Sequence, residues 1–244
     1  MNWYKLILKP NKTFTFFLKL SKLNIAIFLA LLFHISGAIG ILCTPYKQWF
    51  IQNTPLNLLL MAGLLFYTQK EKNTFFYLFA FIAFITGMLT EIIGVNTSLL
   101  FGNYSYAEVM GIKIKGVPLL IGIQWFVAIF CSGSVVHQSH VYLEKKYQSI
   151  GIIVSPKLQF ISIIFDGAAL ATFFDYVMEP VAIKLNFWQW QNNVIPMYNY
   201  VCWFIISLIL LIIFRLLPFN KANHFAIHLF IIQILFFIAL RIFL

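Results

Sequence analysis

The stretch DGAALATFFDYVMEP (residues 166–180), followed by WQW at residues 188–190, carries the most informative pattern in the chain. It is an apolar run that holds three of the protein's seven acidic residues, Asp166, Asp175 and Glu179. An ionisable side chain within an apolar membrane span is costly, so by default it indicates a functional site. Pro180 disfavours helical geometry at the residue before it, so we expect this helix to end near Glu179.

Asp175 and Glu179 are four residues apart and share one face of the predicted helix. A helix dipole disfavours negative charge at its carboxyl end, and burial in apolar surroundings does the same. We therefore expect at least one of these two side chains to keep its proton near neutral pH. A protonated carboxylic acid in an apolar pocket is what a reaction on an inert hydrocarbon would need.

Composition indicates a membrane protein. Of the 244 residues, 61% are hydrophobic and 10% are charged, and the mean hydropathy is +0.89. Repeated apolar runs in a bilayer must satisfy their backbone groups internally, which predicts an all-α, polytopic membrane helix bundle. The net charge of +10 could suggest nucleic acid. Because the basic residues lie between the apolar runs, as membrane orientation requires, we expect no nucleic-acid partner.

The apolar runs predict a single transmembrane domain over residues 1–244 with seven spans, preceded by a basic N-terminal arm at 1–22. Each run is close to the ~20 residues that cross a bilayer. With a cytoplasmic N-terminus, twelve Lys and Arg residues fall on the inner side and five on the outer side, so we expect this orientation in the cell (inner) membrane. The expected spans are 23–42, 49–68, 74–95, 117–136, 158–178, 197–217 and 222–243.

This topology predicts a cluster of polar and aromatic side chains near one membrane face. Glu91 lies near the outer end of the third span, and Asp175 and Glu179 lie at the outer end of the fifth. The two longest outer loops, about 96–116 and 179–196, carry aromatic and amide residues. We therefore expect these acids and aromatics to converge.

Each acid also has a simpler interpretation. Glu91 could form only a structural hydrogen bond between helices, and Glu179 could pair with Lys184 at the water line, where ion pairs contribute little. Asp166 lies on the opposite helix face from Asp175 and roughly 13 Å deeper, at 1.5 Å per residue. It would serve equally well as a helix–helix contact or as a proton relay. His34, in the middle of a span, could play either of the same two parts.

The aromatic residues of the outer segments also have two interpretations. Trp and Tyr gather at membrane interfaces in most such proteins. Alternatively, their electron-rich faces could stabilise a developing cation. Asn199 adds an amide that could hold a water. The aromatic candidates are Tyr104, Tyr106, Trp188, Trp190 and Trp203.

Other classes of site lack their motifs. The pairs His137/His140 and His224/His228 have helical ligand spacing but no nearby carboxylate, so we predict no metal site. The three cysteines are far apart, and phosphate-binding and dinucleotide-binding loops are missing from the sequence. The last predicted span, 222–243, contains no lysine, which excludes a retinal Schiff base.

Several blocks, in order, resemble the membrane-integral carotenoid hydratases of the CruF type, a family that includes the bisanhydrobacterioruberin hydratases. The resemblance covers roughly residues 85–205, and Glu179 keeps a carboxylate where the family more often has Asp. The blocks are FGNYSY (101–106), GVPLL (116–120) with Trp125, DYVMEP (175–180) with WQW (188–190), and IPMYN (195–199) with Trp203.

The resemblance implies addition of water to the terminal double bond of an acyclic, ψ-end carotenoid, without a cofactor. The expected partners are a lycopene-like polyene, water and membrane lipid. We expect Asp175 to be the acid, with Glu91 or Glu179 as its proton partner, and we add Trp125 to the aromatic substrate-binding residues. A lycopene-type cyclase begins its reaction with the same protonation, so this activity is an alternative interpretation. A proton-coupled transporter or a lipid-binding protein is the alternative outside enzymes.

Overall fold

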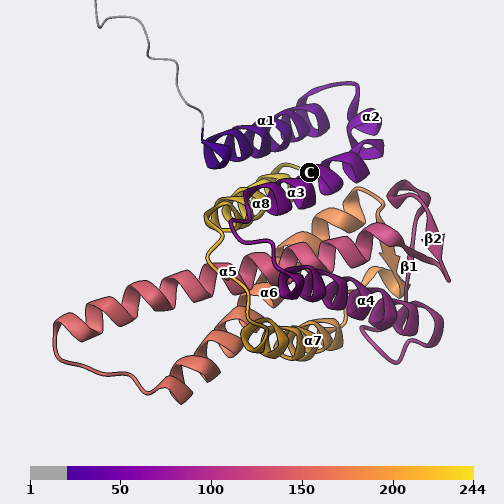
Figure 1. The fold of residues 1–244 in the computed structure, drawn as a ribbon. Helices are drawn as coiled ribbons and strands as arrows, with labels where there is room; N and C mark the ends of the chain where they lie inside the picture. The colour runs from indigo at the N-terminus through magenta and orange to yellow at the C-terminus, as the bar shows by residue number, and fades with distance from the viewer. Residues whose placement is uncertain (1–20) are drawn as a thin grey trace, which may run out of the picture.

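A computed structural model describes residues 21–244, a chain that is mostly helical (Figure 1). The expected basic arm at 1–22 lies almost wholly outside these residues. Short strands occur in the two loops that follow α4 and α6; they are β1 (Tyr104–Tyr106), β2 (Lys113–Ile114), β3 (Val117–Pro118) and β4 (Trp188–Trp190). The helices are α1 (Lys22–Cys43), α2 (Lys47–Gln52), α3 (Thr54–Thr68), α4 (Thr74–Thr97), α5 (Leu119–Ser149), α6 (Pro156–Lys184), α7 (Met197–Leu216) and α8 (His224–Phe243).

Six of these helices, α1 and α4 to α8, are long and apolar enough to cross a membrane. Helix α3 is also apolar but has only 15 residues. The prediction of an all-α, polytopic membrane bundle is therefore confirmed. Where a single span was expected over 49–68, the chain forms two helices that meet at Asn53. Pro55 lies in the first turn of α3, where its missing N–H would have no helical partner, so a new helix can start there.

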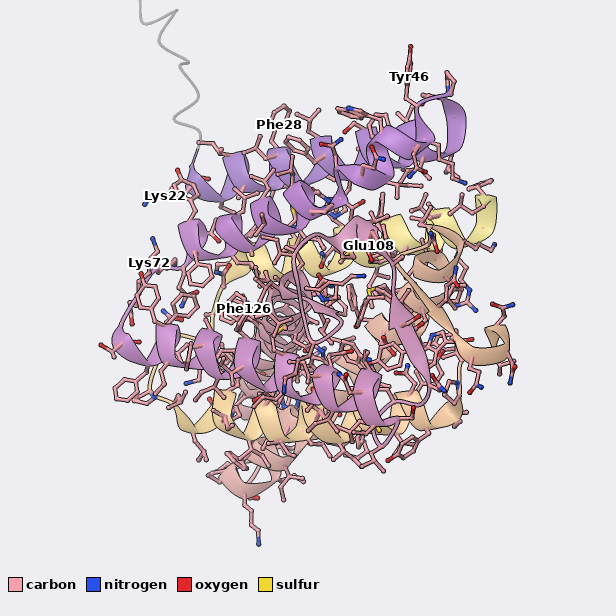
Figure 2. All side chains as sticks on the ribbon, turned by 90° about the vertical axis from the view of Figure 1, so that its right-hand side faces the viewer. Lys22, Phe28, Tyr46, Lys72, Glu108 and Phe126 are labelled. Atoms are coloured by element: carbon pink, nitrogen blue, oxygen red, sulfur yellow. The ribbon has the colours of Figure 1, made fainter. Side chains whose placement is uncertain are left out.

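The helices alternate in direction. Asn73, before α4, donates to the carbonyl oxygen of Pro218 after α7, and Lys22 at the start of α1 lies over the ring of Tyr67 near the end of α3. Figure 2 accordingly shows Lys22 and Lys72 at one end of the bundle and Tyr46 at the other. We call the end where α1, α4, α6 and α8 finish the sheet end, because β1 and β4 lie there (Figure 1).

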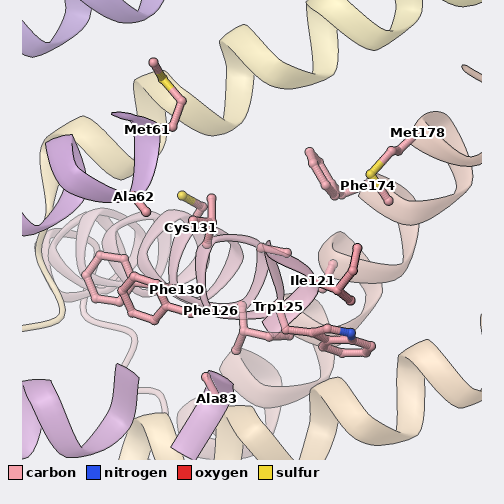
Figure 3. Packing of buried hydrophobic residues seen from close by; sticks show 14 of the residues in the cluster. Met61, Ala62, Ala83, Ile121, Trp125, Phe126, Phe130, Cys131, Phe174 and Met178 are labelled. Atoms are coloured by element: carbon pink, nitrogen blue, oxygen red, sulfur yellow. The ribbon is translucent and has the colours of Figure 1, made fainter. Parts of the chain in front are cut away.

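Helix α5 forms the centre of the packing. It is the most buried of the six long helices, and α3, α4, α6, α7 and α8 pack around it. In Figure 3, Trp125, Phe126 and Phe130 of α5 lie between side chains of α3, α4 and α6. Beyond the bundle, α5 and α6 continue together as a long hairpin (Figure 1). The expected span 158–178 thus lies within the longer α6, whereas the expected span 117–136 begins in β3 and ends inside α5.

The expectation that the fifth span ends near Glu179 is wrong, because α6 continues through Pro180 to Lys184. Proline within a helix leaves the carbonyl four residues earlier without its donor. Here that carbonyl belongs to Tyr176, and the guanidinium of Arg241 on α8 donates to it at 3.4 Å. Asp175 therefore lies more than two turns before the helix end, and the helix dipole, which acts within the last turn, does not govern its charge.

Candidate active site

Two short strands bring aromatic side chains over the sheet end of the bundle. Strands β1 and β4 pair antiparallel, with Tyr104 opposite Trp190 and Tyr106 opposite Trp188. Side chains alternate across a strand, so these four residues face inward while the residues between them, Ser105 and Gln189, are exposed. The alternating sequences YSY and WQW thus present two hydroxyl and two indole N–H donors to the same side of the sheet.

Glu91 of α4 receives three of the donors in this region. The hydroxyls of Tyr104 and Tyr106 donate to its Oε2 at 2.5 and 2.7 Å, and the indole of Trp125 on α5 donates to its Oε1 at 2.9 Å. The side chain is 4% exposed. Hydrogen bonds to a carboxylate are stronger than neutral ones, so these three favour the charged form of Glu91 and oppose the effect of its burial.

Glu179 and Asp175 lie one turn apart on α6, but they accept different numbers of hydrogen bonds. The indoles of Trp188 and Trp190 both donate to Oε2 of Glu179, at 2.9 and 2.8 Å. Asp175, 1% exposed, receives one donor, the amide of Asn199 on α7, at 2.8 Å to Oδ2. Its other oxygen, Oδ1, is buried and has no hydrogen-bond partner among the described residues. Of the three acids, Asp175 is thus the least solvated by the protein.

The same site has an aromatic wall. Trp125 and Trp203 stack with ring centroids 3.9 Å apart and planes 12° from parallel, and Tyr104 lies 4.8 Å from the ring of Trp190. The faces of such rings carry negative electrostatic potential and attract cations. Three carboxyl groups and these π faces therefore make the site favourable for positive charge.

The two tyrosines, which lie in a loop outside the spanning helices, keep their hydroxyl protons. Burial first, and the charge of Glu91 second, raise the pKa of Tyr104 far above its ordinary value. The same two causes raise the pKa of Tyr106 well above its ordinary value. Both hydroxyls therefore stay hydrogen-bond donors to Glu91 at any physiological pH.

A cavity of about 530 Å³ lies between the helices and the paired strands. This volume is within the ~300–1,000 Å³ typical of small-molecule sites. Phe33, Trp49 and Leu56, of α1, α2 and α3, line the cavity and are also exposed, so it opens beside these helices. No Lys or Arg of the described residues lines it. The predicted residues that line it are His34, Glu91, Tyr104, Tyr106, Trp125, Asp175, Glu179, Trp188, Trp190, Asn199 and Trp203.

Three predicted residues, Asp166, His34 and Glu179, had alternative structural interpretations. Asp166 is not part of the cavity lining. Its Oδ2 lies 3.1 Å from Nε2 of His140, a contact between α6 and α5. His34 does line the cavity, and its Nδ1 lies 2.7 Å from the carbonyl oxygen of Ala30. Glu179 does not pair with Lys184, since it is buried beneath the two tryptophans.

Sequence reasoning missed four amides that line the cavity, Asn53, Asn57, Gln124 and Gln233. A signal was present for two of them. Gln124 is the sole polar side chain between Leu119 and Phe130, and Gln233 stands alone in the apolar run of α8. Isolated amides in apolar helices merit the same attention as acids. Within residues 21–244, no group of three or more His, Cys, Asp or Glu side chains is placed to hold a metal.

A glycine on α4 makes room for Trp125 and gives a testable prediction. A Cβ added at Gly87 would lie 2.6 Å from the side chain of Trp125, too close for the indole to stay in place. Gly87→Ala should therefore displace the indole from Glu91 and lower both activity and thermal stability. The control is Gly63→Ala on α3, where nothing lies within 4 Å; removing this helical glycine should stabilise by roughly 0.5–1 kcal/mol. If Gly87→Ala kept the activity and the thermal stability of the wild type, as Gly63→Ala should, the close packing of Gly87 against Trp125 would be contradicted.

Comparison with known proteins shows the family to which this chain belongs. The model of the carotenoid biosynthesis protein family matches residues 54–244, which include all the helices from α3 onward and every strand. The chain therefore belongs to the carotenoid biosynthesis protein family, and its role lies in carotenoid biosynthesis. Neither the curated proteins nor the solved structures include a match to it.

Proposed function

We propose that this protein is a carotenoid 1,2-hydratase, which adds water across the terminal carbon–carbon double bond of an acyclic carotenoid. Membership of the carotenoid biosynthesis family supports the substrate class. The observation that carries the reaction type is the unequal solvation of three neighbouring buried acids. Glu91 and Glu179 together accept five hydrogen bonds, whereas Asp175, which lines the same cavity, accepts one and has a buried oxygen without a partner among the described residues.

This arrangement favours Asp175 as the group that carries a proton. Three carboxylates with no cation among the described lining residues repel one another, and one of them relieves the repulsion by binding a proton. A protonated Asp175 would use Oδ2 as the carbonyl oxygen that accepts from Asn199, and Oδ1, the oxygen without a partner among the described residues, as the hydroxyl. Glu91 and Glu179, held by their donors, would remain anions.

The reaction then needs two steps. The π electrons of the terminal double bond take the proton from Asp175 at the less substituted carbon, which leaves a tertiary cation on the other carbon. A water molecule attacks this cation through its oxygen and releases a proton to the Asp175 carboxylate, so the acid is restored. The anions Glu91 and Glu179 and the faces of Trp125 and Trp203 would stabilise the cation. No electrons are gained or lost overall, so the scheme calls for no redox cofactor.

The cavity fits one end of the substrate. Its 530 Å³ are sufficient for an end group and part of a polyene chain, while the rest of a long carotenoid would pass out beside α1, α2 and α3. The lining at that opening, Phe33, Trp49 and Leu56, is large and apolar. Lipid and polyene are equally apolar, so the chain could remain in the bilayer while its end group reacts.

The test is expression of the protein in cells that accumulate lycopene, with analysis of the pigments by mass spectrometry. We expect a product heavier by one water, carrying a tertiary hydroxyl at the former double bond. A product of unchanged mass with a ring end group would show a cyclase instead. Unchanged pigment in cells that contain the inserted protein, repeated with other acyclic carotenoids, would contradict the proposal and favour a binding or transport role.

A further inference from the structure

The cavity carries a second set of polar side chains besides the three acids. The larger ones come from four helices: His34 on α1, Asn57 on α3, Gln124 on α5 and Gln233 on α8. Ser36, Asn53 and Thr54 also line the cavity, and most of the remaining lining on these helices is apolar. Polar groups from four different helices thus meet at one largely apolar cavity.

Gln124 is the most informative of the four. It is 7% exposed, and its Oε1 is buried without a hydrogen-bond partner among the described residues. It lies on the same stripe of α5 as Ile121 and Trp125, which also line the cavity. Since the indole of Trp125 bonds Glu91, Gln124 is adjacent in sequence to a member of the acid cluster. Buried polar atoms without partners are rare and costly in native proteins.

An amide that served only helix packing would be bonded differently. Gln69, equally buried, shows this: its Nε2 donates to the carbonyl oxygen of Asn220 at 2.7 Å, and its Oε1 accepts from Asn223 at 3.0 Å. Both ends of that amide are satisfied by a neighbouring segment. Neither end of the Gln124 amide has such a bond among the described residues, although the residue is buried and lines the cavity.

The polar groups of this set can bond water. Oε1 of Gln124 and Oδ1 of Asn57 are buried and lack partners among the described residues, and the NH₂ groups of these two amides have no hydrogen bond there either. In His34 the hydrogen must lie on Nδ1, because that atom faces the carbonyl oxygen of Ala30. Nε2 of the neutral ring is therefore an acceptor. A polyene can neither donate a hydrogen bond to such groups nor accept one through oxygen or nitrogen, whereas water can do both.

We propose that Gln124 is a positioning residue for the water that attacks the cation. This inference rests on the proposed hydratase function and adds to it the site of the second substrate. After Asp175 has transferred its proton to carbon, the side-chain amide of Gln124 hydrogen-bonds the water and turns an oxygen lone pair toward the tertiary cation. The new C–O bond forms there, and the surplus proton passes to the Asp175 carboxylate. Asn57 and His34 extend the same polar surface for further water.

The test separates protonation from water capture. The protein in lipid vesicles is incubated with lycopene in deuterium oxide, and both product and recovered substrate are analysed. In Gln124→Met, a side chain of similar length without hydrogen bonding, hydrated product should fall about a hundredfold, the usual cost of a misplaced reactant. Recovered lycopene should still gain deuterium at its end groups, because the cation formed by Asp175 returns a proton when no water captures it. The matched control is Ile123→Met on the same helix, a residue that is not part of the cavity lining, and it should hydrate normally.

Three results would overturn the inference. Normal hydration by Gln124→Met would show that this amide does not position the water. Loss of both hydration and deuterium exchange, in a variant as stable as Ile123→Met, would assign Gln124 to protonation or substrate binding. If the wild-type protein gives no hydrated product, the hydratase proposal itself fails and this inference fails with it.

Discussion

Asp175→Asn is expected to lower carotenoid hydration by about 10²–10⁴-fold, the contribution usual for a general acid, while the protein still inserts and folds. The replacement has the same shape, and its carbonyl oxygen can accept the bond that Asn199 now donates to Oδ2 at 2.8 Å. Only the transferable proton is lost. The measurement is product formation from lycopene in vesicles, with the amount of inserted protein determined in the same samples.

Asp166→Asn is the matched control for this variant. It removes an acid from the same helix, but one whose carboxylate contacts His140 and does not line the cavity. Its activity should remain close to that of the wild type. Full activity in Asp175→Asn, or equal losses in both variants, would remove Asp175 from the role of acid.

Glu91→Gln is expected to impair both stability and activity. Both oxygens of Glu91 accept hydrogen bonds, two from tyrosines and one from Trp125. A glutamine has one acceptor oxygen and an NH₂ group, so at least one of these donors would face another donor. Leaving a buried group unpaired costs about 1–3 kcal/mol, which should lower the unfolding temperature in detergent. Loss of the negative charge beside the cation should reduce turnover by about 10²–10³-fold, as for other preorganised electrostatic groups.

Glu179→Gln separates these two effects. Both tryptophan indoles donate to the same oxygen, Oε2, and a single amide oxygen can accept both. We expect this variant to unfold close to the wild-type temperature while it loses activity through the missing charge alone. An unfolding temperature that falls in Glu179→Gln and is unchanged in Glu91→Gln would contradict the hydrogen-bond pattern described for the two acids.

The bundle and most of the acid cluster could be predicted from sequence because an acid in an apolar run is conspicuous. Lysines between the runs gave an orientation in which Glu91, Asp175 and Glu179 fall at the same end, and the structure places all three in one cavity. The pairing of YSY with WQW could not be predicted, because it joins two loops far apart in the chain. Only that pairing shows which donors each acid receives.

Other features depend on contacts that no local pattern reveals. Pro180 indicates a helix end, but Arg241 on a distant helix supplies a donor to the carbonyl that the proline leaves unpaired, and α6 continues. Gln124 looks like a minor interruption of an apolar run until the cavity beside it is known. In both cases, contacts with distant parts of the chain determine the structural role of the residue.

Infrared spectroscopy of the resting protein tests the central claim most directly, because a protonated carboxyl group has its own C=O stretching band. We predict such a band at neutral pH in the wild type, shifted in deuterium oxide, absent in Asp175→Asn and retained in Glu179→Gln and Asp166→Asn. A band that persists in Asp175→Asn and disappears in either of the other two variants would show that another acid holds the proton, and would contradict the account.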